Sequence, residues 1–312
     1  MNLQQLEYII AIDHCRHFVT AAEKSNVTQA TLSMMIKKLE EELNIKIFDR
    51  SKKPVVPTEI GEKIIKQAKL IIHEANKLSE IVNDEKSEVS GELKIGIIPT
   101  LSPYLLPVFI NTFLKKFPKI HLKISELATD EIVLKLEQQK LDAGILATPL
   151  HKPSIKEHPL FYEEFVVYAS PKEKLLKKKY ILAADIDINK LWLLEEGHCL
   201  RSQVINLCEL KNQERAFHQL DFEAGSIETI IRLVESNQGI TILPSMALLG
   251  MSTKQKKNIR HFKKPAPVRE ISIITYHHFS KERLISALKN EILLHIPEEL
   301  KHQKKNEVIG IK

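Results

Sequence analysis

The pattern of hydrophobic and polar positions changes near residue 90 of this 312-residue chain. Before that point apolar residues recur every three or four positions, which predicts amphipathic helices. After it, short apolar runs alternate with helical stretches, which is typical of an α/β region with parallel strands. We therefore predict an all-α N-terminal part followed by an α/β part.

Three helices are predicted within the first 44 residues. The first is indicated by the helical spacing of the apolar residues Leu3, Leu6, Ile9 and Ile10. A second begins near Phe18, where Thr20 and Glu23 have the spacing of a capping box. Thr28 can cap the third helix. The apolar residues of that helix lie on one stripe formed by Leu32, Ile36, Leu39 and Leu43.

The face opposite this stripe suits DNA, because small residues allow close approach to a groove and polar ones donate hydrogen bonds to bases and phosphates. It consists of Gln29, Ala30, Ser33, Met34 and Lys37. Residues 44–58 then hold two short β-prone pieces around a basic turn, where Arg50, Lys52 and Lys53 are expected to contact the sugar-phosphate backbone. Periodicity alone leaves open a three-helix bundle with a solvated polar face, but this wing-like segment favours a winged helix-turn-helix.

Residues 59–88 read as one long helix with apolar positions at alternating steps of four and three. These positions are Ile64, Ala68, Ile71, Ala75, Leu78 and Val82. Such a seam is typical of a coiled coil, and a helix of this length spans about 40 Å. We predict that it joins two copies of the chain and presents two recognition helices to half-sites about one DNA turn apart, or a multiple of that.

The N-terminal motifs resemble the winged helix-turn-helix of LysR-type transcriptional regulators. The matching segments include Ala21-Ala22-Glu23, Thr28-Gln29-Ala30-Thr31-Leu32-Ser33, Ile36-Lys37-Lys38-Leu39-Glu40, Phe48-Asp49-Arg50, Thr58 and Gly61. The resemblance extends over essentially the whole chain and implies a periplasmic-binding-protein-like effector region of two α/β subdomains around a cleft. As partners it implies double-stranded promoter DNA, RNA polymerase and further copies of the chain, in a homodimer or homotetramer.

The expected domain organisation follows from these elements. In chain order it comprises a winged helix-turn-helix at 1–58, a dimerisation helix at 59–90, an effector domain at 91–297 and a loose polar tail at 298–312. The effector domain divides into subdomains at 91–162 with 268–297, and at 163–267. A cleft of this kind binds small ligands at helix N-termini and strand ends, and the candidates there are Thr100, Ser102 and Thr129.

Composition limits the function classes more than it selects among them. With 43% hydrophobic and 28% charged residues, no membrane-length apolar run and no signal-like N-terminus, the sequence predicts a globular cytoplasmic protein. The net charge of +6 permits nucleic-acid binding, but the first ninety residues hold 13 basic and 14 acidic residues. No nucleotide, catalytic-triad or metal motif is evident, so we expect no cofactor and no metal. The three cysteines fit a reducing compartment better than a disulfide scaffold.

Cys199 and Cys208 are the candidate reactive residues, whereas Cys15 is expected to be a core residue of the first helix. Cys199 stands where a helix should begin. The helix dipole, with His198 and Arg201, is therefore predicted to lower the pKa of its thiol. A thiolate is the form that peroxide oxidises. Spacing alone leaves open that both cysteines are inert core residues.

A narrower resemblance rests on Gly197-His198-Cys199-Leu200-Arg201 with a second cysteine nine positions after the first, on Ile98-Pro99-Thr100, on Thr129 and on His218. These motifs resemble the hydrogen-peroxide-sensing members of the LysR-type family. The resemblance implies that Cys199 is the peroxidatic cysteine and Cys208 the resolving one. It also implies a peroxide pocket formed by Thr100, Thr129, His198, Arg201, His218 and Arg269.

The spacing of the two cysteines would make their oxidation a structural event. If the residues between them are helical, the two Cα atoms lie about 13 Å apart, whereas a disulfide requires about 4.4–6.8 Å. Attack of Cys208 on a Cys199 sulfenic acid would then require the segment to refold. Such a bistable element could reset subunit contacts and the spacing of the DNA-binding heads.

Two other functions are compatible with parts of the sequence. A regulator of the same fold could bind a small organic effector near Thr100, Ser102 and Thr129, with both cysteines structural. A cysteine-based peroxidase is the alternative from another class, but the helix-turn-helix and the long helix would then have no task, so we expect no enzyme. Titration of free thiols against peroxide distinguishes the peroxide sensor from the effector-binding regulator.

Overall fold

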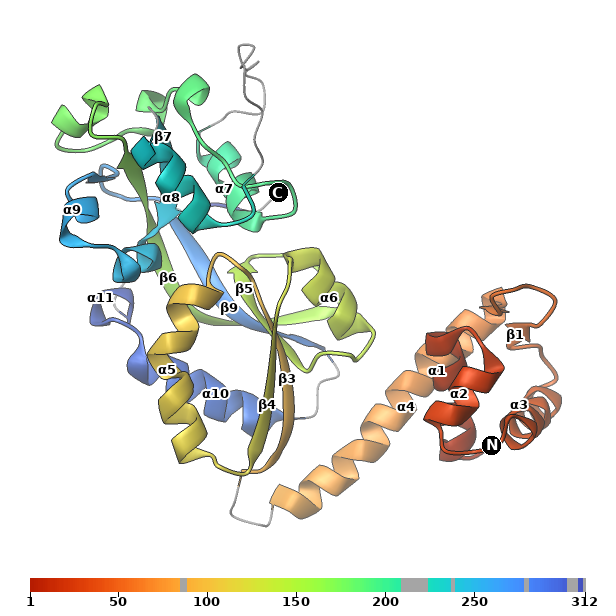
Figure 1. The fold of residues 1–312 in the computed structure, drawn as a ribbon. Coiled ribbons are helices and arrows are strands. Elements are labelled where there is room, and N and C mark those ends of the chain that lie inside the picture. Colours follow the sequence, from red (N-terminus) through yellow and green to blue (C-terminus); the bar gives the residue numbers. More distant parts are fainter. Residues whose placement is uncertain (85–88, 209–223, 237–238, 278–280, 302–307, 311–312) are drawn as a thin grey trace. The chain divides into compact units, whose positions relative to one another are not determined.

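The computed structural model describes the chain except for residues 85–88, 209–223, 237–238, 278–280, 302–307 and 311–312 (Figure 1). The described residues form two compact units, one of residues 1–84 and one that begins at Val89 and contains the rest. The first unit is the helical part predicted from the periodicity. The second is the predicted α/β part.

The N-terminal unit is a three-helix head with a short wing and a long helix. Its elements are α1 (Leu3–Cys15), α2 (Phe18–Lys24), α3 (Gln29–Leu43), β1 (Phe48–Asp49), β2 (Val56–Pro57) and α4 (Glu59–Asp84). Thr28 caps α3 as predicted, since its side chain accepts a hydrogen bond from the backbone N–H of Thr31. The predicted capping box of the second helix is wrong, because α2 already begins at Phe18 and no side chain caps it.

The apolar stripe of α3 forms the centre of the head's core. Leu32, Ile36 and Leu39 are fully buried, while Leu43 packs at its edge. A Cβ atom at Gly61 would stand 2.0 Å from the carbonyl oxygen of Ile47, so only glycine lets α4 pass this close to the wing. Cys15 is partly buried against the same core, as expected.

The first half of α4 belongs to this core as well. Ala68 is buried within it, and Ile64 and Ile71 pack against it. The expectation that the whole seam faces a second copy of the chain is therefore wrong for these three residues, because the head's own core covers them. Leu78, further along the seam, is 67% exposed.

The α/β unit is built on one extended sheet. Its strands are β3 (Gly91–Ile97), β4 (Ile120–Glu126), β5 (Ala143–Thr148), β6 (Ile155–Ala169), β7 (Ile240–Pro244), β8 (Ile259–His261) and β9 (Val268–Tyr276). They follow the order β4-β3-β5-β9-β6-β7, with β8 also paired to β6. The β3, β4 and β5 strands are parallel, as predicted, but β9 runs antiparallel to both β5 and β6. The sheet is thus mixed rather than parallel.

Two long strands connect two subdomains. The β6 strand pairs with β9 from Ile155 to Glu164 and with β7 from Phe165 to Ala169. Figure 1 shows both β6 and β9 running through the two subdomains. One subdomain carries α5 (Ser102–Lys116), α6 (Thr129–Glu137) and α10 (Glu282–His295); the other carries α7 (Cys199–Leu207), α8 (Ile227–Ser236), α9 (Thr253–Lys256) and the 3-10 helix η5 (Ser245–Gly250). The predicted fold class is confirmed: a winged helix-turn-helix is followed in the chain by two α/β subdomains.

The described residues near the C-terminal end pack within the second unit. It forms the short helix α11 (Glu298–Lys301), in which Leu300 is buried. Val308 pairs with Val268 at the start of β9, and Ile309 is buried. The expectation of a loose polar tail is wrong for these residues, because a few apolar side chains within the polar sequence anchor it.

Candidate thiol site and nucleic-acid interface

Cys199 is the first residue of α7 and is almost fully buried. Thr129, the first residue of α6, and the backbone of Ala147 in β5 lie against the thiol and lower its pKa. Thr129 is itself more than nine-tenths buried, and its hydroxyl has no partner in hydrogen-bond geometry among the described residues. A buried hydroxyl whose one polar neighbour is a thiol, a weak hydrogen-bonding group, keeps unused hydrogen-bonding capacity, so this position beside the sulfur is suited to a small polar molecule.

Arg269 supplies a positive charge to the same site from β9. Its side chain is fully buried, and its Nη1 donates to the hydroxyl of Thr100 at 3.2 Å. Its Nε donates to Oε1 of Glu163 at 2.6 Å, in an ion pair with neither side chain exposed. The second carboxylate oxygen of Glu163 accepts the backbone N–H of Met246 at 3.0 Å. The carboxylate therefore fixes the guanidinium in place.

The electrostatics of Cys199 differ from the prediction. Burial raises the pKa of its thiol above the ordinary value, and the charge of Arg269 is the largest effect that opposes this rise. Burial outweighs the helix terminus because water cannot solvate a thiolate there. His198 instead lies 3.5 Å from the carboxylate of Glu195, and Arg201 donates to the carbonyl oxygen of Leu194.

The structure thus brings Thr100, Thr129, Arg269 and Cys199 together from the predicted set. His198 and Arg201 flank the cysteine in sequence, but their described contacts are with Glu195 and Leu194. Ser102 is buried at the start of α5. His218 lies outside the described residues.

Cys208 ends the helix that Cys199 begins. It is buried, and that burial raises the pKa of its thiol to about 12. All three cysteines are free thiols. The nine residues from Cys199 to Leu207 are α-helical, so the two Cα atoms are separated by about 13 Å, roughly twice the distance that a disulfide permits.

Sequence reasoning missed Glu163. An acidic residue inside the apolar run of residues 160–169 was the available signal, because a buried strand tolerates a charge only when it is paired. Its partner Arg269 lies 106 positions further along the chain.

The predicted DNA-contacting face lies on the outside of α3. Gln29, Ala30, Met34 and Lys37 are exposed, while Ser33 is half-buried. Lys52 and Lys53 in the wing are also exposed. Neighbouring groups restrain two positions on this surface: Lys37 pairs with Glu41 at 3.5 Å, and Ser33 accepts a hydrogen bond from Arg50 at 3.3 Å.

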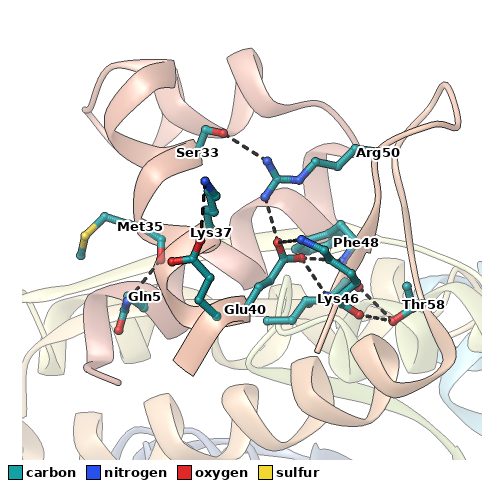
Figure 2. Close-up of polar contacts among 11 residues, drawn as sticks. Gln5, Ser33, Met35, Lys37, Glu40, Lys46, Phe48, Arg50 and Thr58 are labelled. Carbon is teal, nitrogen blue, oxygen red and sulfur yellow. Dashed lines mark hydrogen bonds and ion pairs between the residues drawn. The ribbon is translucent and has the colours of Figure 1, made fainter. Parts of the chain in front are cut away.

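Figure 2 shows that Arg50 bridges the wing and α3. Besides contacting Ser33, its guanidinium donates to Oε2 of Glu40 at 3.1 Å. The guanidinium carbon also lies over the Phe18 ring, 4.9 Å from the ring centroid. The Arg50 side chain is still 39% exposed. The arginine predicted to contact phosphate therefore also orients the wing.

Glu40 is the buried residue that connects the wing to α3, and the sequence prediction did not include it. Its Oε1 accepts the backbone N–H groups of Ile47 and Phe48 at 2.8 and 3.3 Å. Its position next to the apolar stripe of α3 was the signal that it faces inward. The carboxylate thus satisfies backbone donors that would otherwise be buried without partners.

Metal-ligand clusters and membrane-length helices are both absent from the part of the chain that the structure describes. Nowhere in the described ranges do three or more histidine, cysteine, aspartate or glutamate side chains cluster in a way that could bind a metal ion. The described helices include none long and apolar enough to cross a membrane.

The fold and site together define a DNA-binding helix-turn-helix joined to a two-subdomain ligand-binding region. Residues 3–62 match the model of the bacterial regulatory helix-turn-helix proteins of the lysR family, and residues 86–295 match the LysR substrate binding domain. The chain therefore belongs to the LysR family of transcriptional regulators.

Three similar proteins each match most of this chain. A hydrogen peroxide-inducible genes activator of Haemophilus influenzae is 32% identical over 94% of this chain and 97% of its own length. The DNA-binding transcriptional dual regulator OxyR of Escherichia coli K12 is 34% identical over 88% of this chain and 89% of its own. Full-length OxyR of Pseudomonas aeruginosa, in a cysteine-to-aspartate variant, superposes with a TM-score of 0.75 at 33% identity, covering 95% of this chain and 98% of that one.

Proposed function

We propose that this chain is a cytoplasmic regulator of transcription that senses hydrogen peroxide through Cys199 and Cys208. The observation that carries the proposal is the buried Cys199 thiol beside the hydroxyl of Thr129 and under the charge of Arg269. Hydrogen peroxide is small, neutral and able both to donate and to accept hydrogen bonds, so it fits such a site. The names of the relatives support the same signal.

The proposed chemistry has two balanced steps. The Cys199 thiolate attacks one oxygen of hydrogen peroxide, the O–O bond breaks, and the departing oxygen takes up a proton and leaves as water. The sulfur is oxidised by two electrons to sulfenic acid, while peroxide is reduced. Cys208 then loses its proton to solvent, its thiolate attacks the sulfenic sulfur, and the hydroxyl takes up a proton and leaves as water. Arg269 and Thr129 stabilise the charge that develops on the leaving oxygen of the first step.

The second step requires α7 to unwind. In the helix Cys208 is a buried thiol with a pKa of about 12, and its distance from Cys199 excludes direct attack. Loss of the helix frees Cys208 both to approach and to ionise. The disulfide then holds the segment in a second conformation. This change in conformation alters the contacts of the segment with the rest of the molecule and so transmits the signal.

The regulator acts on double-stranded promoter DNA through α3 and the wing. We place the DNA-binding head at residues 1–58, the dimerisation helix at 59–90 and the sensing domain at 91–297. Homodimers assemble through the exposed part of the seam around Leu78 and associate further into a homotetramer. Contact with RNA polymerase accounts for activation, in line with the relatives named as activators.

A footprinting experiment tests the proposal. Wild type, Cys199→Ser and the control Cys15→Ser should bind promoter DNA equally when reduced, because Cys199 belongs to the α/β unit and Cys15 only packs at the edge of the head's core. Peroxide should change the footprint of wild type and Cys15→Ser and leave that of Cys199→Ser unaltered. A peroxide-induced change that persists in Cys199→Ser would contradict the proposal.

Thiol titration separates the proposal from its rivals. In a peroxide sensor, the free thiols of Cys199 and Cys208 disappear together at low peroxide concentration. In a regulator that binds an organic effector, both thiols stay free. A cysteine peroxidase would consume many equivalents of peroxide per chain once a reductant is supplied.

A further inference from the structure

The C-terminal segment Val308–Gly310 contacts the helix that separates the two cysteines. The amide of Gln203, a fully buried residue of α7, donates to the carbonyl oxygen of Ile309 at 2.9 Å. One turn further along the same helix, the amide of Asn206 donates to the carbonyl oxygen of Gly310 at 2.8 Å. Both contacts join residues more than one hundred positions apart in the sequence.

The same segment is also attached to the strand that carries Arg269. The backbone N–H of Ile309 donates to the carbonyl oxygen of Val268 at 2.9 Å, and Val308 forms a parallel bridge with Val268. The Ile309 side chain is buried beside these contacts. Residues 308–310 therefore tie α7 to the start of β9.

This connection opposes the conformational change that a disulfide needs. The two amides emerge from the middle and the last turn of α7, the part that must unwind before Cys208 can reach Cys199. Unwinding would move Gln203 and Asn206 away from their acceptors and leave the carbonyl groups of the C-terminal segment without these partners. Such a loss carries a cost in free energy, because buried acceptors are rarely left unpaired.

We propose that Val308–Gly310 is a clamp that keeps α7 helical and so limits the rate at which Cys208 resolves an oxidised Cys199. This inference rests on the proposed function and adds a regulatory element to it. The clamp acts on the second step, between sulfenic acid and disulfide, and leaves the first step unchanged. It thereby sets how much peroxide exposure is needed to switch the protein.

The size of the effect follows from the hydrogen bonds involved. A neutral hydrogen bond contributes about a factor of five to an equilibrium. If helix opening precedes disulfide formation, loss of one amide contact should speed that step about 5-fold, and loss of both about 25-fold.

Matched variants of the full chain test the clamp. A chain that ends at Glu307 lacks it, whereas a control chain that ends at Ile311 keeps both acceptors as peptide carbonyl groups. Gln203→Met and Asn206→Ala remove one donor each and place good helix formers in α7, so a faster reaction cannot come from lower intrinsic helicity. After a peroxide pulse, alkylation and mass spectrometry follow the conversion of sulfenic acid to disulfide.

Disulfide formation should accelerate in the first chain and in both point variants, and match wild type in the control. Equal rates in all chains would overturn the clamp. Hydrogen exchange of the α7 amides in the reduced proteins gives a second readout that needs no peroxide chemistry. Exchange should be faster without residues 308–312, and unchanged exchange would overturn the clamp. Absence of a disulfide in wild type would instead refute the proposed function, and the exchange measurement would still test the clamp.

Discussion

At the scale of single residues, opposing effects determine the pKa of the Cys199 thiol. Burial favours the neutral thiol, whereas the charge of Arg269 and the contacts of Thr129 favour the thiolate. The balance leaves the pKa raised, so the protonated thiol predominates at neutral pH. Reactivity must then come from the arrangement of groups around the transition state rather than from a permanently charged sulfur.

This balance predicts a pH dependence. Because the Cys199 pKa is raised, the thiolate fraction should increase about tenfold per pH unit from pH 6 to 8, well below that pKa. The rate of sulfenic acid formation should follow it. Stopped-flow measurements on Cys208→Ser, which isolates the first step, give this rate. A flat profile between pH 6 and 8 would mean that the thiolate already predominates.

Glu163 offers a test of the buried ion pair. Glu163→Ala should lower the free energy of unfolding by about 3–5 kcal/mol, because it leaves the Arg269 charge buried without its partner. The neighbouring Glu164 is partly exposed and lies 3.9 Å from His261, so Glu164→Ala should cost no more than about 1 kcal/mol. Urea unfolding of the reduced proteins compares them. Similar losses in both would show that the pair does not anchor Arg269.

Residue identities were predictable from the sequence where a local motif carried them. Each of three residues lies where a helix begins or between a strand and the next helix, which the sequence pattern indicates: Cys199, Thr100 and Thr129. The structure brings them together with Arg269. Glu163 and Glu40 could not be placed in the same way, because each acts through partners that only the tertiary fold brings near. The direction of the Cys199 pKa shift also depended on burial, which the sequence does not reveal.

At the scale of elements, helices with strong periodicity were predicted closely and strand pairing was not. The α3 helix was predicted with its cap because both signals are local. The α5 helix begins at Ser102, three residues before its apolar pattern, since Pro103 can occupy the first turn of a helix. The β6 strand begins at Ile155, where the polar residues Lys156, Glu157 and His158 obscure the strand pattern in the sequence. Antiparallel pairing with β9 depends on contacts across more than one hundred residues.

The connection between α3 and the wing can be tested through Glu40. Glu40→Ala should destabilise the head by about 1–3 kcal/mol, because the N–H groups of Ile47 and Phe48 lose their acceptor. DNA affinity should fall with it, as Arg50 loses its anchor. The exposed Glu41 pairs only with Lys37 among its described contacts, so Glu41→Ala is the control and should cost at most about 1 kcal/mol. Thermal unfolding measures the stability of both variants, and DNA titration measures their affinity. Equal stability and equal affinity of Glu40→Ala and Glu41→Ala would refute the role of Glu40.

At the scale of the whole molecule, charge and hydropathy totals were poor guides to function. The net charge of +6 is not concentrated in the DNA-binding head. The predicted nucleic-acid interface rests instead on the exposed side chains of α3 and the wing. Similarly, the long apolar seam of α4 is not uniform, since Ile64, Ala68 and Ile71 pack with the head's core whereas Leu78 is 67% exposed.

Dimer assembly should therefore depend on the later part of the seam. Leu78→Glu should weaken the dimer at least about 100-fold, because it removes a large apolar side chain from each copy and brings two charges together. Ile60→Glu changes a 42% exposed residue at the start of the same helix and serves as the control. Analytical ultracentrifugation measures the association. A dimer that is equally stable in both variants would place the interface elsewhere.

The central claim, that oxidation of Cys199 produces a bond to Cys208, is tested most directly by peptide mass spectrometry of the full chain after brief treatment with hydrogen peroxide. The account predicts one disulfide-linked peptide pair containing Cys199 and Cys208, with Cys15 still alkylatable, and a Cys199 sulfenic acid in the Cys208→Ser variant. Recovery of both Cys199 and Cys208 as free thiols, or a bond from Cys199 to Cys15, would contradict it.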